Sequence, residues 1–227
     1  MSNKQQKILN VIRVAALILL VGVIVYVAVE LKENPNLASA EGIASLVSPN
    51  RFLAALEFVG LYLLKGISLI FPSAAINVAA GVVFAFPVSV LVSALGIFVE
   101  FLVLYLFGRF FGNDLVAKMK QKYTAVGKID SFQSHNSFFI SFIIRIMGIV
   151  SYDVASIYLG ASGVPIGGFL LGSMCGAMLN IVIDAVFGKY IFDPFHWQLW
   201  AVVGIRIGAI VLAVVVRKRG ERREENL

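Results

Sequence analysis

Long runs of hydrophobic residues, separated by short polar stretches, make up most of this 227-residue chain. Runs at residues 8–29, 88–110 and 166–188 are each long enough to cross about 30 Å of hydrocarbon as one helix. A fourth run near 198–216 predicts a last crossing. The length of the first run favours a retained anchor, spanning 1–31, over the alternative of a cleaved signal peptide. The pattern therefore predicts an all-α integral membrane protein with flanking N- and C-terminal transmembrane helices.

Other apolar stretches are interrupted in ways that a lipid-facing helix would avoid. Residues 51–70 contain Glu57 and Lys65, and residues 71–87 are short and rich in Pro, Gly, Ser and Ala. Residues 137–163 carry two charges and several small residues. Irregular backbone at membrane depth is tolerated where it is buried in protein or lines a wet cavity. We therefore expect re-entrant hairpins at about 71–87 and 137–163.

Basic residues predict the orientation. Lys and Arg residues precede the first run, dominate the loop at 111–136 and recur in the tail at 217–227. We therefore expect a multi-pass protein of the plasma membrane, with this loop and both termini in the cytoplasm. The helix at 88–110 must then run inwards, and the helix at 166–188 must run outwards. The charge pattern thus predicts that each interrupted region enters and leaves the membrane on the same face. The two regions do so on opposite faces.

Two stretches, INVAAGVVFAFPVSVLVSALG and SIYLGASGVPIGGFLLGSMCG, share a plan. Each has a glycine in a small-residue segment, then a proline, then a helix with small residues on one face. We assign Pro72, Gly81, Pro87, Gly160 and Pro165 to the hairpin turns, with Gly81 and Pro87 equivalent to Gly160 and Pro165. Together with the orientation, this predicts an inverted repeat of re-entrant hairpin plus transmembrane helix, as in many secondary transporters.

Composition narrows the function. Hydrophobic residues make up 59% of the chain and charged residues 14%, and the formal net charge is +6. The basic residues lie beside hydrophobic runs, which indicates anionic lipid headgroups as partners and not nucleic acid. The single cysteine, Cys175, excludes a disulfide framework within one chain, and His135 and His196 have no metal-ligand spacing. No catalytic triad or phosphate-binding loop is present, so we expect neither an enzyme nor a cofactor.

Charged residues inside apolar segments are the candidate functional groups, because an ionised side chain at bilayer depth costs at least about 2.5 kcal/mol. Arg145 and Asp153 lie on opposite limbs of a turn or two helical turns apart. They either form a buried ion pair that holds the hairpin, or bind an anionic headgroup through Arg145 with Asp153 orienting it or coupling a proton. Arginine suits phosphate because its fork donates two parallel hydrogen bonds.

Further candidates lie in the long helices. Glu100 is in the middle of one predicted span, and Asp184 lies in the other with Asn180 one turn before it. Either these acids serve transport or they hydrogen-bond between helices, and Arg206 of the last span is a candidate partner for one of them. Arg109 lies at a span end, where snorkelling to the interface is the simple explanation.

The blocks FPSAAINVAAGVVFAFPVSVLVSALG, YLFGRFFG and RIMGIVSYDVASIYLGASGV, in this order and spacing, resemble the DedA and SNARE-associated Golgi protein superfamily, whose shared core is the VTT domain. The resemblance covers about residues 50–190, leaving 191–227 as a C-terminal helix and basic tail. It is closer to the bacterial Golgi-protein-like branch than to DedA proper. The resemblance implies two facing re-entrant hairpins and lipid transport, since eukaryotic relatives are phospholipid scramblases and some bacterial relatives move undecaprenyl phosphate or phospholipids.

The resemblance also assigns residues. The family's arginine after the amphipathic loop corresponds to Arg145, its polar position before the second turn to Asp153, and its Gly-Arg pair to Gly108 and Arg109. The chain departs from the family where DedA proteins often carry an acid in the first hairpin. Ser73 and Asn77 stand there in this sequence, and we include Asn77 among the candidates.

A second departure concerns the first core span. DedA proteins often have Gly-Asp four residues before a tyrosine, whereas Glu100 and Phe101 precede Tyr105 here. Glu100 can replace the acid with a shift of one residue, about 100° around the helix. Coupling to protons, proposed for bacterial members, is therefore left open.

The sequence thus predicts a lipid transporter or scramblase that moves a phospholipid or polyprenyl phosphate headgroup across the bilayer. A proton-coupled ion or small-solute transporter and a membrane scaffold without transport are the alternatives. A homo-oligomer is compatible with the sequence.

Overall fold

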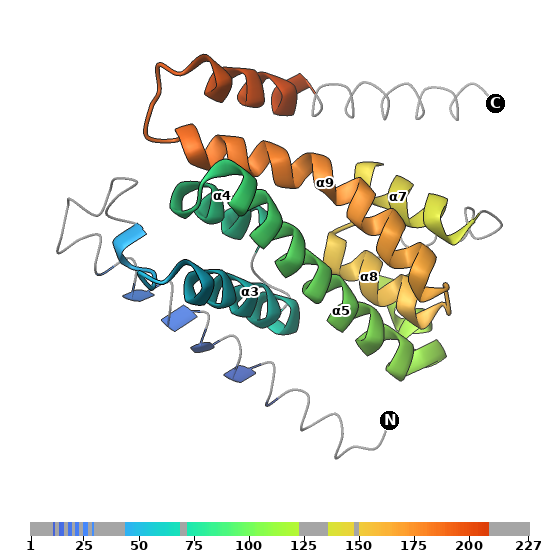
Figure 1. Ribbon diagram of the computed structural model, residues 1–227. Coiled ribbons are helices and arrows are strands. Elements are labelled where there is room, and N and C mark those ends of the chain that lie inside the picture. The colour runs from blue at the N-terminus through green and yellow to red at the C-terminus, as the bar shows by residue number, and fades with distance from the viewer. Residues whose placement is uncertain are drawn as a thin grey trace.

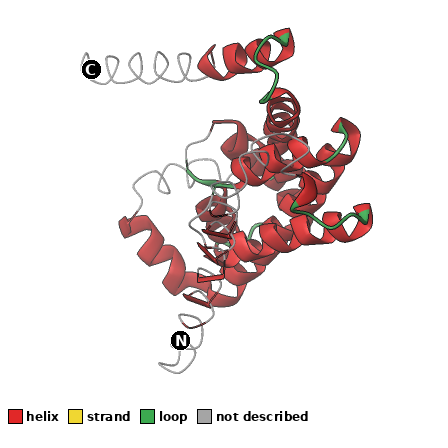
Figure 2. Ribbon diagram, turned by 90° about the vertical axis from the view of Figure 1, so that its left-hand side faces the viewer, coloured by secondary structure: helices red, strands yellow, loops and turns green. Residues whose placement is uncertain are grey.

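The computed structural model describes residues 44–68, 72–122, 136–147 and 150–208, with scattered positions between 11 and 29. Every regular element in these residues is a helix (Figure 2). The expected all-α class is therefore confirmed for the part of the chain that is described. Most of the predicted N-terminal anchor, part of the basic loop and the basic tail lie outside it.

Within these ranges, six helices form the core (Figure 1). They are α3 (Arg51–Ser68), α4 (Ser73–Val83), α5 (Phe86–Lys122), α7 (Ser137–Met147), α8 (Tyr152–Ala161) and α9 (Ile166–Tyr190). A further helix begins at residue 197 and continues to 208, the last described residue. The helix α5 extends beyond the predicted span end at 110 to Lys122, into the hydrophilic stretch 111–136, because Leu, Ala, Met, Lys and Gln there favour helix.

Two described helices, Phe86–Phe110 and Ile166–Tyr190, are long and apolar enough to cross a membrane by length and composition, each with 25 residues. They match two of the predicted spans. Figure 1 shows α5 and α9 lying side by side and running in opposite directions. The apolar helices α4 and α7 are much shorter, with 11 residues each.

Local signals start and stop the short helices. Ser151 is the N-cap of α8 and accepts a hydrogen bond from the Val154 amide at 3.4 Å. The turn after α8 contains Gly163 at φ +78°, a conformation that favours glycine. Pro165 is the N-cap of α9, whereas Pro87 lies inside the first turn of α5, where its fixed φ is tolerated.

The packing is reciprocal. The short helix α4 packs against α9, and the short helix α8 packs against α5. A Cβ placed on Gly81 would lie 2.5 Å from the Ala185 carbonyl oxygen, and one on Gly160 would lie 2.1 Å from the Tyr105 carbonyl oxygen. We predicted these two glycines at hairpin turns, and that placement is wrong. Both lie inside helices, where the missing Cβ lets two backbones cross closely.

The same contacts recur from the side of the long helices. A Cβ on Gly108 of α5 would lie 2.0 Å from the Ile157 carbonyl oxygen, and one on Gly188 of α9 would lie 2.1 Å from that of Val78. We call α3 to α5 the first helix triplet and α7 to α9 the second. The crossing of α4 on α9 thus has a counterpart in the crossing of α8 on α5. Gly81 and Gly160 are equivalent, as the sequence predicted, and such reciprocal crossings are those that a pseudo-two-fold axis produces.

Candidate functional site

A cavity of about 300 Å³ lies where the helix pair α3–α4 approaches the helix pair α7–α8. We call the end of α3 and the start of α4 (65–68 and 72–74) the first tip, and the end of α7 and the start of α8 (145–146 and 150–153) the second tip. Polar lining side chains come from both tips, from α4 and α9, and from the helix at 197–208. They are Lys65, Ser73, Asn77, Ser151, Asp153, Asn180, Asp184 and Arg206.

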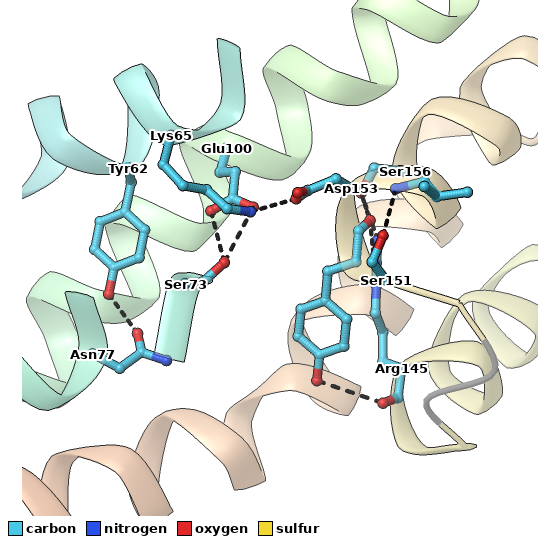
Figure 3. Close-up of polar contacts among 11 residues, drawn as sticks. Tyr62, Lys65, Ser73, Asn77, Glu100, Arg145, Ser151, Asp153 and Ser156 are labelled. Carbon is cyan, nitrogen blue, oxygen red and sulfur yellow. Dashed lines mark hydrogen bonds and ion pairs between the residues drawn. The ribbon is translucent and has the colours of Figure 1, made fainter. Parts of the chain in front are cut away.

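Lys65 connects the tips. Its side chain is 3% exposed, and its ammonium lies 2.6 Å from Glu100 Oε1 of α5 and also pairs with Asp153 of α8 (Figure 3). The Ser73 hydroxyl of α4 donates to Glu100 Oε2 at 3.3 Å. One lysine therefore joins both helix triplets, with two carboxylates around it.

A second polar chain includes Asn77 and Asp184 of the cavity wall. The Tyr62 hydroxyl donates to the side-chain oxygen of Asn77, and the Asn77 amide donates to Asp184 Oδ2 at 2.8 Å. Asp184, 2% exposed, also accepts from Arg206. The predicted partnership of Arg206 with one of the acids in the long helices is therefore confirmed, and the acid is Asp184.

Asn180 contributes a third contact to the same wall. Its side-chain amide donates to the Tyr152 hydroxyl at 2.7 Å, which links α9 to the second tip. Asn180, Asp184, Asp153 and Asn77 all line one cavity although the sequence separates them widely. Four of the seven predicted site residues are thereby brought together, and Glu100 joins them through Lys65.

Arg145 is elsewhere. It is 1% exposed, does not line the cavity, and donates to the Tyr152 carbonyl oxygen and the Ser156 hydroxyl, each at 2.7 Å. Its guanidinium lies 4.1 Å from the centre of the Phe101 ring and 5.8 Å from that of Phe169. The expected ion pair with Asp153 is not formed, because the hydrogen-bond partners of Arg145 are neutral groups. The headgroup role stays a prediction, and in this structure the guanidinium lies against aromatic rings and outside the cavity.

Arg145 still holds its hairpin. It reaches from the end of α7 to the first turn of α8, so it joins the two limbs of the turn. Arg109 also lies apart from the cavity. Its side chain is exposed near Gly163, at the other end of α8, as expected for a residue at a span end.

Sequence reasoning did not include Lys65 among the candidate site residues. The signal was present, because Lys65 is a charge inside an apolar stretch, and we noted it as an interruption of that stretch. Its partners lie 35 and 88 residues away, so its role required the fold. Tyr152 was missed because a tyrosine in an apolar run carries no such signal.

The charges around the cavity are arranged in partnered groups. Lys65 and Arg206 supply two cations, and Glu100, Asp153 and Asp184 supply three acidic groups. Because each charge has an opposite partner, the cost of burial is offset within the protein. A ligand with a charged headgroup could enter by exchanging one of these partners. Among the described residues, no cluster of three or more His, Cys, Asp or Glu side chains could hold a metal ion.

Comparison with known families gives one match. The family described as the VTT domain matches residues 71–190, slightly more than half of the chain. This region contains α4, α5 and α7 to α9, and so includes the pair α7–α8 and all of the pair α3–α4 except α3. No curated protein matches the chain, and no solved structure matches it.

Proposed function

Because the chain belongs to the VTT-domain family, the membrane-associated family of DedA and SNARE-associated Golgi proteins, we propose that it moves a phosphate-bearing lipid headgroup across a bilayer. The observation that carries the proposal is the cavity of about 300 Å³ with charged walls, set between two helices apolar enough to span. A polar headgroup would occupy the cavity while the acyl chains stay in the lipid. The protein acts as a transporter or scramblase and not as an enzyme.

In this proposal the two helix pairs are re-entrant. An 11-residue helix such as α4 is about 16 Å long, roughly half of the hydrocarbon thickness, so it reaches the midplane but does not cross. The 10-residue helix α8 is equally short. Two pairs entering from opposite faces would bring their tips together at mid-depth, which the Lys65–Asp153 contact supports.

The electrostatics of the tips suit a phosphate. The first turns of α4 and α8 both face the cavity, and helix N-termini carry partial positive charge. The N-cap of α4 is Pro72, which provides no side-chain hydrogen bond to that turn. Unwound helix starts near the midplane commonly point at anionic groups in transporters. Lys65 and Arg206 add formal positive charge, which in this structure is paired with the three acidic groups and becomes available to a phosphate when one of them is displaced.

We further propose a multi-pass arrangement in the cell membrane with both termini in the cytoplasm. The support is the excess of Lys at 118–128 and the Lys and Arg residues of 217–223. Membrane lipids with anionic phosphate groups are the partners.

A reconstitution experiment tests the function. Purified protein in liposomes should accelerate the movement of a labelled phospholipid, or of undecaprenyl phosphate, between leaflets. Arg206→Ala, which removes a cavity cation, should slow this movement, whereas Arg51→Ala, at the exposed start of α3, should not. If folded protein moves none of these lipids, the proposal is wrong.

One observation favours a second candidate, a proton-coupled ion or small-solute transporter. Two carboxyl groups, Glu100 and Asp153, share one ammonium group in this cluster, an arrangement that can take up a proton. This candidate predicts acidification-driven flux of a soluble substrate in liposomes, with no change in lipid distribution.

A further inference from the structure

Lys65 has two different carboxylate partners. Glu100, with a fully buried side chain, lies on its protein side, and Asp153, with a side chain 13% exposed, lies at the cavity. Glu100 belongs to the same helix triplet as Lys65, whereas Asp153 belongs to the other triplet. The Lys65–Asp153 pair is therefore an ion pair between the two tips, and we call it the tip bridge.

The two partners differ in how readily they can be replaced. Glu100 also accepts a hydrogen bond from Ser73 and is enclosed by protein. Asp153 is in the first turn of α8 and retains access to the cavity, so it can turn away from Lys65 without entering an apolar environment. Lys65 and Asp153 both line the cavity, so a group in the cavity has access to both members of the pair.

We propose that the phosphate of the lipid headgroup replaces Asp153 as the cavity-side partner of Lys65, and that this exchange opens the tip bridge. The inference rests on the proposed function and names the residue that recognises the substrate. A phosphodiester carries one negative charge, as the carboxylate does, so the buried ammonium keeps two anionic partners throughout. This matters because an uncompensated buried charge is strongly unfavourable.

If this exchange occurs, substitutions of Lys65 and of Asp153 should have opposite effects on lipid binding. Lys65→Gln removes the cation that binds phosphate, so binding should fall about tenfold or more, the factor expected for loss of a charge-assisted hydrogen bond. Asp153→Asn removes the competing anion but keeps Lys65 paired with Glu100, so binding should become tighter. A merely structural ion pair predicts that both changes weaken binding, because both break the same contact.

Binding is measured on the purified full-length protein in detergent by calorimetry, with dihexanoyl phosphatidylglycerol in one arm and inorganic phosphate in the other. Lys189→Gln and Asp193→Asn are matched controls, because both residues are exposed and lie outside the cavity. Glu100→Gln combined with Lys65→Gln keeps the buried cluster balanced if the single lysine variant does not fold. Weaker lipid binding by Asp153→Asn would overturn the inference. So would unchanged lipid binding by Lys65→Gln and by its combination with Glu100→Gln. Binding of inorganic phosphate without binding of the lipid would overturn it as well.

Transport separates this inference from the proposed function. The same variants are assayed in phosphatidylethanolamine and phosphatidylglycerol vesicles with labelled phosphatidylglycerol. If the wild type moves lipid and Lys65→Gln moves it equally fast, the inference fails while the proposed function stands. If the wild type binds the short-chain lipid through Lys65 but moves none in vesicles, the proposed function fails while the binding site stands.

Discussion

The two helix triplets, α3 to α5 and α7 to α9, share a framework but differ in chemistry. The crossing of α4 on α9, at Gly81 and Gly188, matches the crossing of α8 on α5, at Gly160 and Gly108. The triplets differ at the tips, where the first supplies Lys65 and the second supplies Asp153. The two equivalent backbone crossings therefore hold both triplets in the same arrangement. The polar side chains at the tips differ between the triplets, and they line the cavity.

One equivalent position shows the difference most clearly. A Cβ on Gly96 would collide with the ring of Tyr62, and a Cβ on Gly176 would lie 2.6 Å from the Cβ of Arg145. Tyr62 donates a hydrogen bond to Asn77, and Arg145 donates one to Ser156. These two acceptors lie four residues before Gly81 and Gly160, respectively. A phenol and a guanidinium thus make the same connection, which teaches that the framework requires a long donor there but not a charge.

The largest effect is expected at the crossings. Gly108→Val and Gly188→Val each push a side chain into a backbone carbonyl that cannot move aside, so both should abolish folded, monodisperse protein. Gly60→Val is the control, because a Cβ there meets nothing within 4 Å. Size-exclusion chromatography in detergent makes the comparison. A folded product from one crossing variant and not the other would break the equivalence of the halves.

The next effect is expected at Arg145. Arg145→Ala should destabilise the protein by about 3 kcal/mol, because it empties space between aromatic rings and removes two hydrogen bonds. Arg145→Met restores most of the volume and should cost less. Thermal unfolding in detergent measures both. Lipid movement per folded molecule should persist in Arg145→Met, and its loss would instead support the headgroup role that the sequence suggested.

Tyr62→Phe tests the equivalent position in the first triplet. It removes one buried hydrogen bond to Asn77 and leaves the ring packing intact, so we expect a loss of about 1 kcal/mol. The same unfolding measurement applies. A loss as large as that of Arg145→Ala would mean that the phenol, like the guanidinium, carries more than one connection.

The smallest effect is expected at the helix starts. Pro87→Ala and Pro165→Ala act at the first turn of α5 and the N-cap of α9, and each should cost about 0.5–1 kcal/mol, mainly by freeing the unfolded chain. Similar shifts in unfolding temperature would extend the equivalence to the turns. If either change stabilised the protein, that proline would be strained in the folded state, and the expected equivalence of the two turns would be contradicted.

Much of the fold follows from hydrophobic pattern. Runs of apolar residues predicted α9 and the apolar part of α5, Phe86–Phe110, closely, since length and composition are sufficient to identify a span. The hydrophilic end of α5 lies outside that run. The equivalence of Gly81 and Gly160 was also readable, but not their role. Small residues near prolines suggested turns, and the crossing partners Ala185 and Tyr105 could be known only from the packing.

The candidate site was predicted in part, for a physical reason. Charges in apolar segments identify groups that need partners, and this rule found Glu100, Asp153 and Asp184. It does not say which partner each one takes. Arg145 was therefore paired with its neighbour in sequence, whereas the acid at Asp153 pairs with Lys65 from the other half.

The reciprocal crossings also have a consequence in time. Gly81 meets Ala185 about 100 residues later in the chain, and at about 5–20 residues per second synthesis needs roughly 5–20 s to supply that partner. During this interval the small-residue face of α4 has no α9 to cover it. A ribosome stalled before α9 would therefore leave a fragment in which this face stays uncovered.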